Sequence, residues 1–428
     1  MPDRVDLTRR KFLKRTAAVA AISQLPIARS AHAAGSGTIR VGLVGCGGRG
    51  RGAVANVLEA DRETQLVALG DVFEDQAADS LRLLKRKFGS RINSSRVGTF
   101  IGFDAYEKVI QSGVDLVLLT TPPGFRPLHF EAAVQAGKHV FMEKPLAVDA
   151  PGVRKVLATA ELAKQKTLRV GAGFNWRHQN DYVETIRRVR SGAIGTVREI
   201  KVHRRGGGVW VRQRKPSQTE MEYQMMNWYY FVWLSGDFLV EQHVHGLDIC
   251  QWIKGRPPTR ARGIGGRKER FGPDHGEIFD NFQLEYSYDD GTRLISDCSH
   301  LSTVDKGVGQ HVVGSLGNAI PSSGTIDGRT TWKFTGQKGN AYVAQTASLL
   351  DAIRNGVPYD ETENGAMSTI IAIMGRMAAY EGREITWDEA VNSNEAYLPE
   401  RYAWDADPPT LPDKFGDYVI PARGKPLS

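Results

Sequence analysis

The chain has 428 residues, 41% hydrophobic and 24% charged, with 56 Lys and Arg against 48 Asp and Glu. Its length is enough for two domains with sizeable cores, and its three cysteines are too few for a disulfide framework. The formal charge of +8 falls to +3 without residues 1–33, which hold seven of the basic and two of the acidic residues. The mixed signs that remain give no case for nucleic-acid binding.

Residues 1–33 are expected to form an export signal and not part of the fold. The segment Thr-Arg-Arg-Lys-Phe-Leu-Lys at 8–14 has the twin-arginine pattern, a modest apolar stretch follows at 17–27, and Ala-His-Ala at 31–33 is typical of a cleavage site. The apolar stretch is too short and too weak to span a bilayer. The alternative is an ordinary basic tail. The pattern predicts a periplasmic or otherwise exported protein, with no membrane segment in its mature form.

A glycine-rich turn organises the rest of the chain. It follows an apolar run at 39–44 and precedes residues 53–60, which favour a helix, so the order is strand, turn and helix. In Gly-x-Gly-x-x-Gly, the first glycine allows a tight turn, the second lets the backbone approach a pyrophosphate, and the third lets helix and strand pack closely. The turn residues expected to contact the cofactor are Gly45, Gly47, Gly48, Arg49 and Gly50. Arg49 could instead only cover the loop.

A second apolar run, residues 66–69, ends at Asp71, which lies 21 residues after Gly50. An acidic residue about 20 positions after the turn is expected to bind the ribose of a dinucleotide. Its carboxylate accepts a hydrogen bond from a free 2′-hydroxyl and repels a 2′-phosphate, so NAD is favoured over NADP. The alternative is a solvated acid at a strand end.

Strands and helices alternate after Asp71, which is typical of a parallel sheet covered by helices. The expected strands are 98–103, 114–120 and 139–142, and the expected helices are 76–88, 105–112 and 129–136. Ligands bind at the carboxyl ends of such strands. The residues at or just beyond those ends, expected near a nicotinamide, are Thr121, Pro122, His129, Glu143 and Lys144.

The segment Ala-Gly-Lys-His-Val-Phe-Met-Glu-Lys-Pro at 136–145, together with the glycine turn and Thr-Pro-Pro at 121–123, resembles the glucose-fructose oxidoreductase, inositol dehydrogenase and MocA family (Gfo/Idh/MocA). The resemblance covers roughly residues 38–390. It implies an α/β fold: an N-terminal Rossmann domain, then an α+β domain whose large open, mainly antiparallel sheet carries a sugar or cyclitol. It also implies that Lys144 contacts both cofactor and substrate. Alone, a lysine at a strand end is more often only solvated.

The domains are expected at 38–172 for the Rossmann part and 173–390 for the substrate and oligomerisation part, with an irregular tail at 391–428. The segment 174–178, which includes Arg177 as a further expected cofactor contact, matches the family's crossing between domains. Expected strands are 197–204, 279–288, 293–299 and 331–334, and expected helices are 181–191, 340–355 and 364–382. The proline-rich tail is expected to wrap its own subunit or a neighbour in a homo-oligomer, a dimer or a tetramer.

Glu241, His245 and Asp248 form the second catalytic constellation, with a spacing that would align them on one face of a helix. Imidazole titrates near neutrality, so His245 could exchange the alcohol proton while a carboxylate orients it. In the family pattern His245 matches the catalytic histidine and Asp248 the final acid, but Glu241 replaces an aspartate and His243 a glycine. A structural histidine is one alternative. A zinc site of Glu241, His243 and His245 is another, and nothing else supports it.

The segment 204–233 is rich in aromatic residues interleaved with amides and acids, which suits stacking on sugar faces while hydroxyls are bound. An ordinary core or subunit contact would look the same. The residues expected to contact substrate here are Arg205, Trp210, Tyr223 and Trp228, in addition to Lys144 and Asp248.

These features together predict an exported NAD-dependent oxidoreductase acting on a sugar, glycoside or cyclitol hydroxyl. Lys144 would anchor the hydroxyl and lower its pKa, His245 would serve as acid and base, and Glu241 would orient. Because free NAD is not expected to be regenerated after export, the cofactor should be tightly held. The alternatives are an NAD-dependent glycoside hydrolase, which oxidises C3 transiently and eliminates the aglycone, and a non-catalytic sugar-binding protein. A Cys250–Cys298 bridge is a further open possibility.

Overall fold

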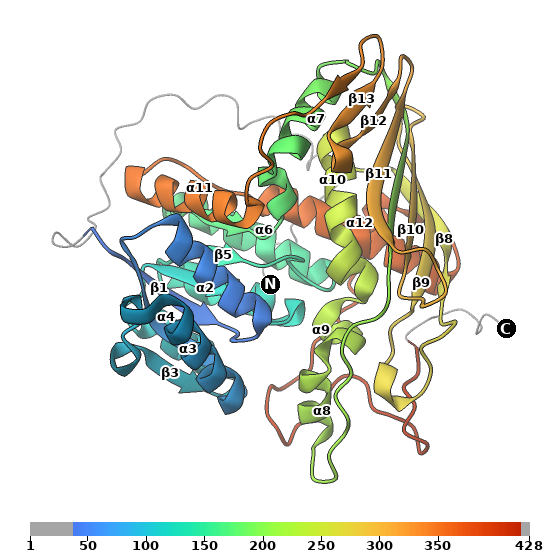
Figure 1. Ribbon diagram of the computed structural model, residues 1–428. Helices are drawn as coiled ribbons and strands as arrows, with labels where there is room; N and C mark the ends of the chain where they lie inside the picture. The colour runs from blue at the N-terminus through green and yellow to red at the C-terminus, as the bar shows by residue number, and fades with distance from the viewer. Residues whose placement is uncertain (1–36, 421–428) are drawn as a thin grey trace.

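The computed structural model describes residues 37–420, so the expected export signal at 1–33 lies outside the described part. Two sheets organise the described chain (Figure 1): a six-stranded sheet near the N-terminus and a nine-stranded sheet built from the rest. Between residues 37 and 420, no helix combines the length and the apolar character needed to cross a membrane.

The first sheet is parallel throughout, with strand order β3-β2-β1-β4-β5-β6. Its strands are β1 Ile39–Val44, β2 Thr64–Asp71, β3 Gly98–Ile101, β4 Leu116–Leu119, β5 His139–Met142 and β6 Val170–Ala172. Its helices are α2 Gly48–Ala60, α3 Glu74–Phe88, α4 Ala105–Gln111, α5 Arg126–Gln135 and α6 Ala150–Gln165. Strand β4 reads Leu-Val-Leu-Leu with every residue buried, as expected where helices cover both faces. The predicted Rossmann domain is confirmed.

Parallel pairing brings the expected cofactor residues to one edge of this sheet. Val44 is in register with Leu119, and Leu119 with Met142, so strands β1, β4 and β5 end side by side. The glycine turn, Thr121 and Lys144 follow directly after these three strand ends.

The second sheet has the order β14-β13-β12-β11-β7-β10-β9-β8-β15 and is antiparallel except for the β7 and β10 pair. Its strands are β7 Val197–Arg205, β8 Arg260–Gly266, β9 Asn281–Ser287, β10 Arg293–Ser299, β11 Gly307–Gly314, β12 Asn318–Ile320, β13 Thr325–Asp327, β14 Trp332–Lys333 and β15 Ile385–Thr386. The prediction that the sheet of the second domain is mainly antiparallel is confirmed. Strands β8 and β11 were not among those expected, because each contains three glycines, which strands generally disfavour.

Helices of the second part connect the two sheets. They are α7 Asn180–Arg190, α8 Glu220–Met226, α9 Val232–Ser235, α10 Val244–Lys254, α11 Ala341–Asn355, α12 Thr362–Glu381 and α13 Trp387–Asn392. Figure 1 shows α10 and α12 between the nine-stranded sheet and the Rossmann domain. Helix α11, which a domain boundary at residue 173 assigns to the second part, packs on α2 through Leu349, Leu350 and Ile353. One apolar core continues from the Rossmann sheet into the second part, so it holds the two parts together.

A buried arginine fixes the junction between the two parts. Arg376 of α12 is 1% exposed, and its Nη1 donates to the carbonyl oxygens of Val148 and Gly236, both at 2.8 Å. Val148 lies four residues after Lys144, and Gly236 five residues before Glu241. Arg376 therefore holds together the two backbone segments that carry the expected catalytic side chains.

Replacement of Arg376 by Met should lower the free energy of unfolding by about 3–5 kcal/mol, because it leaves two buried carbonyls and the nearby Asp237 carboxylate without their cation. Arg383→Met is the matched control: this arginine, just beyond the same helix, is half exposed and should cost under about 1 kcal/mol. Urea unfolding followed by circular dichroism measures both. Equal effects of the two substitutions would contradict this role.

Candidate active site

Packing explains two glycines of the turn but not the middle one. A Cβ at Gly50 would lie 2.0 Å from the Gly45 carbonyl oxygen, and Gly45 itself has φ +93°, which L side chains rarely adopt. A Cβ at Gly47, in contrast, would meet no protein atom within 4 Å. Packing therefore requires glycine at positions 45 and 50, whereas Gly47 leaves the backbone open to a ligand.

The start of helix α2 beside this turn suits an anion. No side chain caps the helix, and its first turn contains no acidic residue. Arg49 forms an ion pair through Nε with Glu143, while its Nη2 is buried without a partner among the described residues. Free backbone N–H groups and an unpaired guanidinium nitrogen are donors that a pyrophosphate would satisfy. The turn therefore fits a dinucleotide.

Asp71 at the end of β2 is held in place but keeps acceptor capacity. Its Oδ2 accepts from the backbone N–H of Cys46 at 2.6 Å and its Oδ1 from that of Phe73 at 3.0 Å. Burial raises the pKa of Asp71, and these backbone hydrogen bonds oppose the rise. A carboxylate has about four acceptor sites, so acceptor capacity remains for a ribose hydroxyl.

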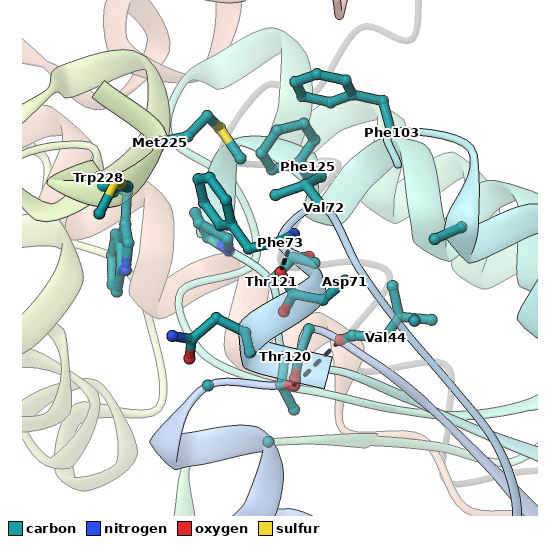
Figure 2. A pocket seen from close by; sticks show the side chains of 18 of the residues that line it. Val44, Asp71, Val72, Phe73, Phe103, Thr120, Thr121, Phe125, Met225 and Trp228 are labelled. Carbon is teal, nitrogen blue, oxygen red and sulfur yellow. Dashed lines mark hydrogen bonds between the residues drawn. The ribbon is translucent and has the colours of Figure 1, made fainter. Parts of the chain in front are cut away.

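A cavity of about 750 Å³ lies along this edge of the Rossmann sheet (Figure 2). Expected cofactor residues that line it are Gly45, Gly47, Gly48, Arg49, Gly50, Asp71, Thr121, Pro122 and His129. Figure 2 shows Met225 and Trp228 on one side of the cavity and Asp71 on the other, with Phe73 between them. His129 is buried beside Thr121, whose hydroxyl lies 3.2 Å from Nδ1, and burial lowers the pKa of His129 to about 3. His129 is therefore an uncharged residue in the wall of the cavity.

Lys144 and Glu241 meet across the two parts of the chain. Lys144 Nζ donates to Glu241 Oε1 at 2.8 Å and also to the Glu241 carbonyl oxygen, and each side chain is 12% exposed. Glu241 lies in a π-helical turn, Leu239–His243, which directly precedes α10. Such turns are rare in proteins overall, and those that occur are often found at functional sites. The glutamate in the position of the family's aspartate thus reaches the lysine.

His245 follows this turn as a neutral imidazole. Its ring packs against Phe174 and Trp176, with centroids at 6.1 and 5.2 Å, and no other described residue forms a hydrogen bond with it. Burial, and after it the positive charge of Lys144, lowers the pKa of His245 well below its usual value. The ring is therefore uncharged, and its nitrogens are available to a ligand.

Asp248 and Arg177 have an environment different from the one expected. The Asp248 carboxylate is 1% exposed, accepts from Arg177 Nη2 at 2.8 Å and from Ser368 Oγ at 2.7 Å. Arg177 also donates to Gln251 at 2.6 Å. Each group therefore already has a protein partner, and the expected substrate contact of Asp248 and cofactor contact of Arg177 stay predictions. Glu241, His245 and Asp248 do not form one exposed helix face, because Glu241 lies in the π turn, where the residue spacing differs from that of an α-helix.

The four aromatic and basic residues expected to contact substrate divide into two pairs. Trp210 and Trp228 line the cavity, with ring centroids 5.7 Å apart. Tyr223 is 1% exposed, and its hydroxyl donates to the Pro273 carbonyl at 3.2 Å, so it is a core residue. Arg205 pairs with Asp297 and projects from the face of β7 opposite the buried Val202. Neither Arg205 nor Tyr223 lines the cavity, and their substrate contacts stay predictions.

The sequence reasoning missed Arg126 in α5. This fully buried arginine donates to the carbonyl oxygens of Leu119 at 2.6 Å and Thr121 at 2.7 Å. Burial lowers its pKa to about 10, and the negative charges of Glu143 and Glu241 oppose that change. A charged residue in the first turn of an expected helix gives no sign in the sequence that it is buried.

The C-terminal tail, defined here as residues 393–420, packs on the wall of the cavity. Trp404 contacts Phe73 and Phe103, with ring centroids at 5.3 and 4.6 Å, and Tyr402 contacts Phe125 at 5.1 Å. All three phenylalanines line the cavity. The tail thus covers its own subunit, at the place where a dinucleotide fits.

The cysteines and the proposed zinc ligands have structural surroundings. Cys46, Cys250 and Cys298 are all buried free thiols, so the Cys250–Cys298 bridge is not formed. Within residues 37–420 no group of three or more His, Cys, Asp or Glu side chains could hold a metal ion. His243 is buried with its Nε2 2.9 Å from Ser296 Oγ.

Several curated proteins are similar in sequence. The inositol 2-dehydrogenase of Burkholderia cenocepacia is 28% identical over 242 residues, which cover 56% of this chain and 61% of that protein. The match thus spans about three fifths of the length of that relative. Inositol 2-dehydrogenase 3 of Saccharopolyspora erythraea is 25% identical over 328 residues, covering 74% of this chain and 86% of the relative.

Solved structures with the same fold include an aldose-aldose oxidoreductase from Caulobacter crescentus in complex with glycerol, with a TM-score of 0.63 and 20% identity over 82% of this chain and 99% of that one. A levoglucosan dehydrogenase in complex with NADH and levoglucosan has a TM-score of 0.63 at 16% identity, with the same coverage. At these identities the likeness concerns the fold alone.

Two family profiles match in succession. Residues 39–174 match the oxidoreductase family with an NAD-binding Rossmann fold, and residues 182–320 match the GFO/IDH/MocA C-terminal domain. Together the two matches cover most of the chain; the first contains the whole six-stranded sheet and the second contains strands β7 to β12 of the nine-stranded sheet, and we conclude that this chain belongs to the Gfo/Idh/MocA family of oxidoreductases.

Proposed function

We propose that this protein is an NAD-dependent oxidoreductase that oxidises or reduces a ring carbon of a sugar or cyclitol. The observation that carries the proposal is the ion pair of Lys144 and Glu241 beside a neutral His245, at the edge of the sheet where the glycine turn and Asp71 fit NAD. The substrate class is supported by the relatives, which are named as inositol dehydrogenases.

The side chains divide the work of alcohol oxidation. Two donors of the Lys144 ammonium are used by Glu241, so the third can bind the substrate hydroxyl and stabilise the developing alkoxide. The hydroxyl proton passes to a nitrogen of His245, which is neutral and has no hydrogen-bond partner within residues 37–420, while the carbon–oxygen bond becomes a carbonyl. NAD, when bound, accepts the hydride from the same carbon. In the reverse direction His245 returns the proton.

We also propose that the protein holds its NAD tightly and is exported with it. Two segments distant from the Rossmann domain in sequence support retention: the covering segment, residues 209–228, lines the cavity, and the C-terminal tail packs behind its phenylalanines. The support for export is the twin-arginine pattern within residues 1–33. A cofactor bound before export would need no exchange afterwards.

Lys144→Met tests the proposed chemistry. Loss of a preorganised charged donor should lower kcat/KM by at least about 100-fold, while the NAD content per chain is unchanged. The measurement is the absorbance of reduced nicotinamide after addition of a panel of cyclitols and aldoses. Lys155→Met is the matched control, because Lys155 forms an exposed pair with Glu131 on α6 and α5. Wild-type activity in the Lys144 variant would refute the assigned role.

Trp404→Ala tests the retention of the cofactor. Its two aromatic contacts are each worth about 0.5–1.5 kcal/mol, so their loss should raise the rate of NAD dissociation by roughly tenfold. Purified protein would be diluted into buffer without nucleotide, and the released NAD quantified over time. Phe415→Ala, in the same tail but 75% exposed, should release NAD at the wild-type rate. An unchanged rate in the Trp404 variant would show that the tail does not retain the cofactor.

A further inference from the structure

Arg204 lies near the end of β7 and is not among the residues expected to contact the cofactor or the substrate. Side chains alternate along the strand, and Ile200 and Val202 are buried on the face that packs against α10. Arg204 shares that face, and its partner in register on β10 is the buried Cys298. The Arg204 guanidinium therefore lies on the face of the sheet that α10 covers. The Lys144–Glu241 ion pair, called the catalytic pair below, lies on the same side.

A short chain of contacts joins Arg204 to the catalytic pair. Its Nε donates to Gln242 Oε1 at 2.8 Å, and Gln242 is the residue next to Glu241, which binds Lys144. The charge of Arg204 is also one of the causes, after burial and Lys144, that lower the pKa of His245. Arg204 is thus bonded to the π turn that carries Glu241.

Arg204 differs from the other arginines near this centre in having no anionic partner. Arg49 pairs with Glu143, and Arg177 pairs with Asp248. Within the described part of the chain no carboxylate lies within 4 Å of Arg204, although the residue is half buried. A partly buried cation that is bonded only to a neutral amide would be stabilised by an anion.

The charges around the centre point the same way. Lys144 and Arg49 are paired with Glu241 and Glu143, whereas Arg126 and Arg204 have no carboxylate within 4 Å among residues 37–420. Because Nε of Arg204 is used by Gln242, its two terminal nitrogens remain as a planar pair of donors. That arrangement matches the two oxygens of a carboxylate.

We propose that Arg204 binds a carboxylate of the substrate, so that the protein acts on an acidic sugar, such as a uronate. The inference rests on the proposed function, because it names the substrate class of that same site. It makes Arg204 a specificity-determining residue, whereas Lys144 and His245 perform the chemistry.

The test compares matched substrates on the protein purified with its own NAD. For each of D-glucose, D-galactose and D-mannose and its uronate, the second-order rate constant for single-turnover reduction of the bound NAD is measured from the absorbance of reduced nicotinamide. The wild-type protein should prefer the uronate of at least one pair by about 10- to 100-fold, which corresponds to one hydrogen bond to a charged group. Arg204→Met should remove most of that preference, and Arg204→Lys should keep part of it, since it retains the cation without the planar fork.

The control is Arg293→Met, which removes an arginine from the neighbouring strand β10, where it is half exposed and paired with Glu285. It should keep the wild-type ratio, and NAD content per chain checks the folding of every variant. Binding of D-glucuronate is measured in parallel by calorimetry. Binding of glucuronate through Arg204, with no reduction of NAD by any uronate, aldose or cyclitol tested, would support the anion site and refute the proposed oxidoreductase.

Other outcomes would overturn the inference. Equal or better turnover of the neutral sugars would refute it and leave the proposed function intact. A stronger preference for glucose 6-phosphate than for glucuronate would refute a carboxylate site. Absence of both binding and turnover of all three uronates would refute it as well.

Discussion

The site depends on one ion pair between distant parts of the chain, Lys144 and Glu241, which are 97 residues apart. A partly buried pair adds little stability by itself, because desolvation offsets most of the attraction. Its effect here is on geometry: one partner follows strand β5 of the Rossmann domain, and the other lies in the π turn before α10. The ammonium can be held over a cofactor only when both parts of the chain are folded and docked.

The π turn that presents Glu241 is itself held by buried polar groups. Asp237, just before it, has φ +73°, a conformation unfavourable for a residue other than glycine. Its carboxylate accepts from the backbone N–H of Phe279 at 3.0 Å and from the Tyr380 hydroxyl at 2.6 Å. These contacts, from the segment just before β9 and from α12, compensate the strained backbone. The second sheet and its helices therefore act as the support that sets the direction of the glutamate.

Much of the nucleotide half could be predicted from the sequence because its signals are local. The glycine turn, Asp71 and Lys144 each follow an apolar strand, and parallel pairing is enough to bring them together. The other half could not be predicted in the same way. The pairing of Arg177 with Asp248 and the approach of Trp404 to Phe73 are contacts between residues far apart in sequence, created by packing. The burial of Arg126 also depends on packing, although its two carbonyl partners lie only five and seven residues before it. The π turn breaks the helical spacing on which the alignment of Glu241 and Asp248 was based.

Residues expected from the sequence to contact substrate lie in separate places in the structure, among them the wall of the nucleotide cavity and the surroundings of Lys144 and Glu241. Trp210 and Trp228, expected to stack on a sugar, share the cavity of Asp71 and Phe73, and Lys144, Glu241 and His245 are not among the residues that line it. The aromatic segment and the tail therefore form the wall of the nucleotide cavity. The contacts next to the Lys144–Glu241 pair come instead from β7 and the π turn, through Arg204 and Gln242. Because different segments carry these roles, substitutions in the tail can change cofactor retention without changing substrate choice. Substitutions on β7 can do the reverse.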